Sequence, residues 1–67
     1  MKMRIYTGEG KNPIPVARRM SELRPRNHEM VGVVDLGDFG AYTEAEFRAE
    51  AVRLAIESGI VSYDADE

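Results

Sequence analysis

The chain of 67 residues contains no cysteine, no tryptophan and a single histidine, His28. The absence of cysteine excludes a disulfide scaffold and any zinc site built from thiolates. A chain this short forms one domain, residues 1–67, whose small core leaves little room for a water-poor catalytic cleft. Asp35 and Asp38 with His28 are the best candidates for metal ligands, but their spacing is not diagnostic. We therefore expect no catalytic residue, no cofactor, no metal site and no enzymatic activity.

Long apolar runs are also absent. No window holds the 18 or more apolar residues that a membrane span needs. The first six residues lack both the apolar stretch and the small-residue cleavage site of a secretory signal. We expect a cytoplasmic protein that makes no membrane contact.

The charges that are present divide unevenly along the chain. Residues 1–28 hold seven basic and two acidic residues, a net charge of +5. Residues 29–67 hold two basic and ten acidic residues, a net charge of −8. Such asymmetry indicates a charged partner, although two halves that attract each other in the fold would show the same pattern.

Three segments have the pattern of strands. Residues 1–6 alternate apolar and polar side chains, the period of a strand with one buried face. The run Met30–Leu36 is short and β-branched, which favours a central strand buried on both faces. Gly32 within it indicates a bulge or the close approach of a helix. Ile60–Tyr63 is predicted to be a short last strand, followed by a solvated acidic tail, residues 64–67.

A first helix is predicted after the loop at residues 7–13, because Pro15 suits a first helical position. Val16, Met20 and Leu23 recur at i, i+4 and i+7 and would form one apolar stripe. Pro25 would end this helix.

The second helix has the clearest local signals. Thr43 and Glu46 have the spacing of a capping box, and Gly59 suits a left-handed stop. These signals predict a helix over residues 44–58. With the elements in the order β-α-β-α-β, we expect an α+β fold: a small three-stranded sheet with two helices packed on it.

An acidic arc lies on one side of the second helix, where Glu46, Glu50 and Glu57 surround Arg53. Carboxylates in such a row lie about 5–6 Å apart at Cβ, comparable to successive phosphates on a nucleic-acid strand. The arc and tail could therefore occupy a basic nucleic-acid-binding groove. The predicted partner-binding residues are Glu46, Glu50, Glu57, Asp64, Asp66 and Glu67.

A second side of this helix is apolar and alanine-rich: Ala45, Ala49, Val52 and Ile56. Helices usually bury a single stripe, so this side needs its own cover. The first helix, a second copy of the chain or a partner could supply that cover.

In its small size, acidity, lack of cysteine and lack of a catalytic signature, the chain resembles small phage-encoded antagonists such as anti-CRISPR proteins. The resemblance implies a rigid, non-enzymatic inhibitor that binds a host nucleoprotein and blocks it by occupancy. Its partner would be a protein or nucleoprotein with a basic surface, and we expect no direct nucleic-acid binding.

Two other functions stay open from the residues alone. A homo-oligomeric or complex-assembly module, such as a homodimer, could be held together by the alanine-rich side. A nucleic-acid binder could use the basic half of the chain, against the net charge of −3. Its candidate residues are Lys2, Arg4, Arg18, Arg19, Arg24 and Arg26.

Overall fold

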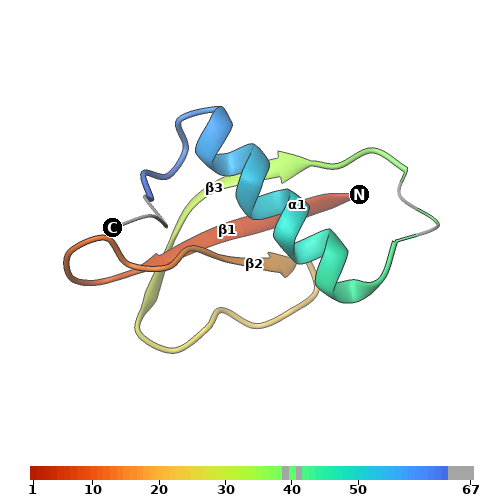
Figure 1. The fold of residues 1–67 in the computed structure, drawn as a ribbon. Helices are drawn as coiled ribbons and strands as arrows, with labels where there is room; N and C mark the ends of the chain where they lie inside the picture. Colours follow the sequence, from red (N-terminus) through yellow and green to blue (C-terminus); the bar gives the residue numbers. More distant parts are fainter. Residues whose placement is uncertain (39, 41, 64–67) are drawn as a thin grey trace.

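A computed structural model describes residues 1–38, 40 and 42–63. The elements are β1 (Lys2–Gly8), β2 (Val16–Arg19), β3 (His28–Asp35) and α1 (Glu44–Glu57). The three strands form an antiparallel sheet in the order β2-β1-β3, and α1 packs on one face of it (Figure 1). The predicted α+β class with a three-stranded sheet is confirmed, but the observed order is β-β-β-α, with one helix in the described residues.

The central strand is β1, and its alternation was predicted correctly. Met3 and Ile5 are completely buried beneath α1, where they meet Phe47 and Ala51. Tyr6 follows Ile5 and belongs to the other face, yet only 2% of its surface is exposed. Each face of the sheet therefore has some cover at β1.

Residues 20–27 connect β2 to β3. This segment leaves β2 at one edge of the sheet and enters β3 at the other, so it must cross β1. In Figure 1 the segment runs past β2, on the side of that strand away from β1, before the chain enters β3. The helix and strands of the described residues thus form two layers, α1 and the sheet.

The predicted first helix is wrong, because its start forms strand β2. Val16 and Ala17 pair with Tyr6 and Ile5 of β1, and the loop at residues 9–15 makes the two strands a hairpin. A helix here would leave that edge of β1 without backbone partners, a cost that outweighs a weak local stripe. The stripe itself is not buried, since Leu23 is 90% exposed.

The predicted central strand is also misplaced, because β3 is an edge strand. Met30, Val31 and Val33 are 54%, 39% and 42% exposed, so the strand is not buried on both faces. With a single helix, the fold has no second layer wide enough to cover it. Of the two alternatives for Gly32, the close approach comes from Ile60, which follows α1 and is not part of the helix: a Cβ on Gly32 would lie 2.5 Å from its Cγ2. The register of β1 with β3 also shifts beside it, as in a bulge.

Helix α1 matches its prediction closely. The capping box between Thr43 and Glu46 is present, and the helix ends one residue early, at Glu57. Gly59 has a φ of +80°, the left-handed conformation that its position after the cap requires. Local sequence signals were sufficient here because both ends are fixed by contacts within a few residues.

The predicted last strand, Ile60–Tyr63, is wrong. The backbone N–H groups of Ile60 and Val61 both point at the carbonyl of Ala55, at 3.0 and 3.4 Å, so the chain folds back onto the end of α1. Val61 is 9% exposed and joins the core. The predicted acidic tail, residues 64–67, lies outside the described residues.

Candidate functional site

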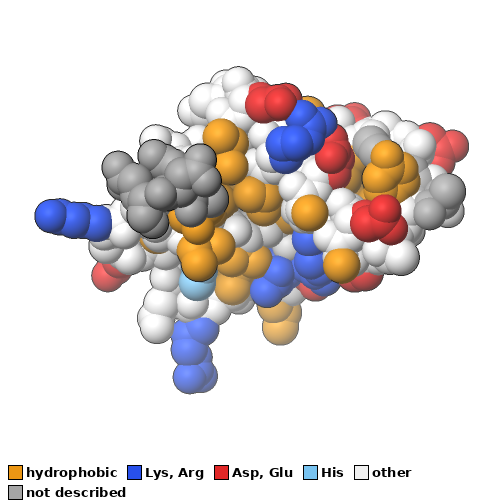
Figure 2. Space-filling view, in the orientation of Figure 1, with side chains coloured by type: hydrophobic (Ala, Val, Ile, Leu, Met, Phe, Trp, Pro, Cys, Tyr) orange, Lys and Arg blue, Asp and Glu red, His pale blue; other side chains and the backbone are white. Residues whose placement is uncertain are grey.

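The acidic arc of Glu46, Glu50 and Glu57 lies on an uncovered side of α1, but its carboxylates are not all free. Arg53 donates from Nε to Glu50 at 3.2 Å and from Nη1 to Glu57 at 2.6 Å. Figure 2 shows acidic and basic side chains together over this helix. Three carboxylates around one guanidinium leave the arc a net charge of −2.

Glu46 holds a separate position at the start of the arc. Its Oε1 accepts hydrogen bonds from the backbone N–H and the hydroxyl of Thr43, at 3.0 and 2.9 Å. These bonds, the backbone one first, lower the pKa of Glu46, so the group stays ionised. Glu46 therefore both caps α1 and contributes charge to the arc.

Arg53 keeps the middle of the arc ionised as well. Its hydrogen bonds lower the pKa of Glu50. The two glutamates in turn raise the pKa of Arg53 above its already high value, through the bond to Glu50 first and the bond to Glu57 second. Arg53 and Glu57 are exposed and Glu50 is half-buried, so a partner's charges can readily replace the pairing of Arg53 with Glu57.

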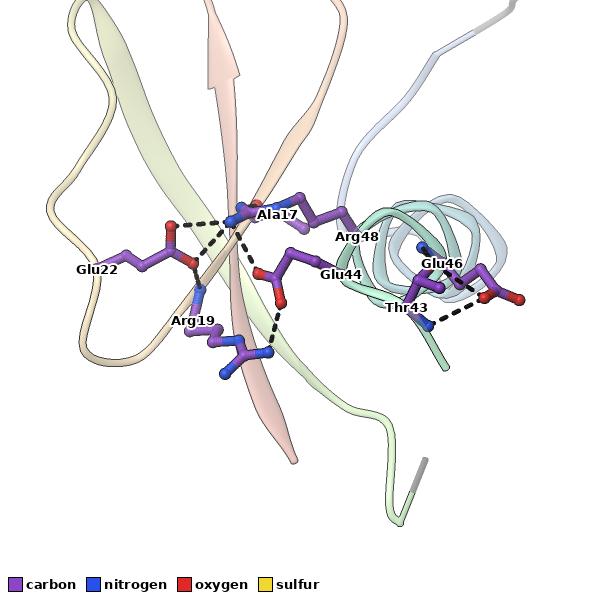
Figure 3. Close-up of polar contacts among 7 residues, drawn as sticks. All are labelled: Ala17, Arg19, Glu22, Thr43, Glu44, Glu46 and Arg48. Atoms are coloured by element: carbon purple, nitrogen blue, oxygen red, sulfur yellow. Dashed lines mark hydrogen bonds and ion pairs between the residues drawn. The ribbon is translucent and has the colours of Figure 1, made fainter. Parts of the chain in front are cut away.

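A second ion network, missed by sequence reasoning, joins α1 to β2. Arg48 donates from Nη1 to the carbonyl of Ala17 at 2.8 Å and contacts the carboxylates of Glu22 and Glu44 at 3.0 and 2.9 Å (Figure 3). Arg19 forms an ion pair with Glu44. We call Arg19, Glu22, Glu44 and Arg48 the seam network. Glu44 and Arg48 have the i, i+4 spacing of a local helix pair. Their contacts with Arg19 and Glu22, which lie 25 and 26 positions away, have no local spacing that could have indicated them.

The seam network also closes the outer edge of β2. Glu22 accepts a hydrogen bond from the backbone N–H of Arg19 at 2.8 Å, while Arg48 satisfies the carbonyl of Ala17. The bond from Arg19, and then the one from Arg48, lower the pKa of Glu22. Side chains thus occupy the groups that a foreign strand would need.

The face of the sheet away from α1 carries unpaired positive charge. Arg4 lies directly opposite Arg18 on the neighbouring strand, an arrangement that like charges disfavour. Within residues 1–38, 40 and 42–63, six basic side chains have no ion pair. They are Lys2, Arg4, Lys11, Arg18, Arg24 and Arg26.

The metal ligands considered from the sequence are not brought together. His28 begins β3 and Asp35 ends it, and seven strand steps separate them by about 23 Å. Asp35 instead accepts a hydrogen bond from the backbone N–H of Gly37 at 2.9 Å and pairs with the N-terminal ammonium group at 3.4 Å. Those contacts, the first being the larger, lower the pKa of Asp35.

The alanine-rich side of α1 is not covered by another helix in the described residues. Ala49 and Val52 instead line a shallow groove of about 370 Å³, together with Pro15, Val16 and Arg18 at β2. Ala49 is exposed and Val52 half-buried. This side is available to a partner, but its groove is open and small.

The chain matches no family model, no curated protein and no solved structure. In the described part of the chain, no helix is both long and apolar enough to cross a membrane. Function therefore has to be argued from the surfaces themselves.

Proposed function

We propose that this protein is a non-enzymatic inhibitor that blocks a nucleoprotein by occupying its basic, nucleic-acid-binding surface, as in the anti-CRISPR-type antagonists that it resembles. The observation that carries the proposal is the acidic arc on α1. Glu46 and Glu57 are exposed, and no described segment lies over the arc. A partner can reach the arc without any rearrangement of the fold.

The chemistry of the arc suits this role. Glu50 and Glu57 lie two helical turns apart, about 10 Å, and Glu46 extends the row by one further turn. A basic groove that accommodates successive phosphates presents lysines and arginines along a comparable length. Those lysines and arginines of the partner would replace Arg53 as the ion-pair partners of Glu50 and Glu57. Charged groups at such an interface mainly raise the association rate and select the partner.

The test is a panel of purified CRISPR effector complexes, scored for loss of target-DNA binding when the protein is added. The decisive variant changes Glu46, Glu50 and Glu57 to glutamine. Glutamine is accepted in the capping box, so Glu46→Gln preserves the helix start while removing charge. We expect the wild-type protein to inhibit at least one complex and this arc variant to inhibit it at least about tenfold less.

A matched control removes three carboxylates elsewhere, with Glu9→Gln, Glu29→Gln and Asp38→Asn. None of these three residues has an ion pair within the described residues. Net charge changes equally in both variants, so only the position of the charge differs. Equal inhibition by the arc and control variants would assign the effect to net charge and reject the arc.

A second candidate function is favoured by the pair of Arg4 and Arg18. Arg4 and Arg18 are opposite each other in the register of β1 and β2, and Arg18 Nη1 donates to the carbonyl of Ala17 at 2.9 Å. A phosphate bound by both arginines would relieve their repulsion. This candidate ranks lower because both side chains are partly covered. The surface also belongs to a chain of net charge −3.

The two candidates predict different binding to nucleic acid alone. We expect no measurable binding of a fluorescent single-stranded oligonucleotide at physiological salt, by anisotropy. Micromolar binding with a steep salt dependence, lost in the variant Arg4→Gln with Arg18→Gln, would replace the first proposal by the second.

A further inference from the structure

The two edges of the sheet differ in a way that the proposed function does not explain. At the β2 edge, Arg48 and Glu22 occupy the outward backbone groups of Ala17 and Arg19. At the β3 edge, no backbone group bonds outward to the rest of the described chain. The strand at that open edge is eight residues long, twice the length of β2. An unprotected edge of this length is a template for another strand.

The outward groups of β3 follow from its pairing with β1. The backbone N–H of Leu36 donates to the carbonyl of Met1 at 2.7 Å. Because the direction of the backbone groups alternates along a strand, those of Val34 point toward β1, and those of Val33 and Asp35 point away from it. The bulge then shifts the alternation by one residue. Beyond it, Met30 and His28 are the residues whose backbone groups point outward, because they lie opposite Tyr6 and Gly8 of β1. The four outward residues are His28, Met30, Val33 and Asp35.

These four positions are symmetric about the middle of β3. An antiparallel second copy can therefore pair His28 with Asp35 and Met30 with Val33, and the same two pairs recur on the other side of the two-fold axis. In this pairing, Met30 lies next to the apolar Val33 of the other copy, and the imidazole of His28 lies beside the carboxylate of Asp35. All four side chains lie on the face away from α1, where Met30 and Val33 are 54% and 42% exposed.

We propose that β3 pairs antiparallel with β3 of a second copy, so that the protein is a homodimer with one continuous sheet of twice three strands. Both copies of α1 then lie on the same face of that sheet. The groove beside the edge, lined by Leu54 and Ile60 among others, adds apolar surface next to the junction. This inference does not depend on the acidic arc, although Glu57 of the arc lines the same groove.

Sedimentation velocity over about 1 to 300 µM tests the dimer. We expect wild-type protein to sediment with twice the chain mass of 7.5 kDa at the upper concentrations. Val33→Lys places a charge in the junction and should raise the dissociation constant by at least about tenfold. Met30→Lys, at a more exposed position on the same strand, should do the same if Val33→Lys impairs folding.

A charge-swapped variant tests the register. Met30→Glu combined with Val33→Lys places opposite charges across each pair, so dimerisation should recover relative to Val33→Lys alone. Ala49→Arg is the matched control, because it introduces a charge on the alanine-rich side of α1 and should leave the dimer intact. A wild-type protein that stays monomeric throughout would overturn the proposal and leave the edge to a strand of another protein. Dissociation by Ala49→Arg but not by Val33→Lys would overturn it in favour of the helix side.

Discussion

Two ion networks share α1, and they differ in what they connect. The seam network joins the helix to β2 and to the segment after it, with Arg48 30% exposed at its centre. The network of Glu50, Arg53 and Glu57 stays within one helix, and Arg53 is 53% exposed. Arginine and glutamate therefore join two layers of the fold in the seam network, whereas in the second network they pair only on the surface of one helix. Formal charge counts cannot make this distinction, because both networks contribute acidic residues to the same total.

The largest difference should appear when the central arginine of each network is removed. Arg48→Ala should destabilise the protein by about 1–2 kcal/mol, because it takes a charged donor from the carbonyl of Ala17 and from two carboxylates. Arg53→Ala should leave the denaturation midpoint nearly unchanged, since exposed pairs within one helix add little. Urea denaturation followed by circular dichroism measures both. Equal losses in the two variants would remove the distinction between the networks.

Acid should weaken the seam network as the pH falls. The pKa of Glu22 is lowered in the folded protein, so its contribution is fully present above its ordinary value of 4.5 and is lost as the pH falls toward the folded value. Glu22→Gln should therefore reduce the decline of the urea midpoint between pH 5 and pH 3, as approximate bounds. Glu9→Gln, outside both networks, should keep the wild-type decline. An unchanged decline in Glu22→Gln would show that the seam carboxylate does not couple to folding.

The contrast between α1 and β2 shows which parts of the fold the sequence could predict. Both ends of α1 are fixed by neighbours in sequence, Thr43 with Glu46 at the start and Gly59 at the end. The identity of β2 depends instead on pairing with β1 across a hairpin, a non-local contact that outweighs weak helical spacing. The exposed Leu23 could not be recognised as exposed before that pairing was known.

The candidate site divides in the same way. The positions of Glu46, Glu50 and Glu57 on one side of α1 followed from helical periodicity. The neutralising contacts of Arg53 were only partly foreseen, and the seam network around Arg48 was missed because its partners come from another layer. The position of Arg4 opposite Arg18 likewise could be known only from the strand register.

The association rate with an inhibited effector complex, measured by stopped flow against salt concentration, tests the central claim about the acidic arc most directly. The account predicts that changing Glu46, Glu50 and Glu57 to glutamine slows association at low salt, and that the difference shrinks as salt screens the charges. The control with Glu9→Gln, Glu29→Gln and Asp38→Asn should associate at nearly the wild-type rate. An arc variant with the wild-type rate and the wild-type salt dependence would contradict the account.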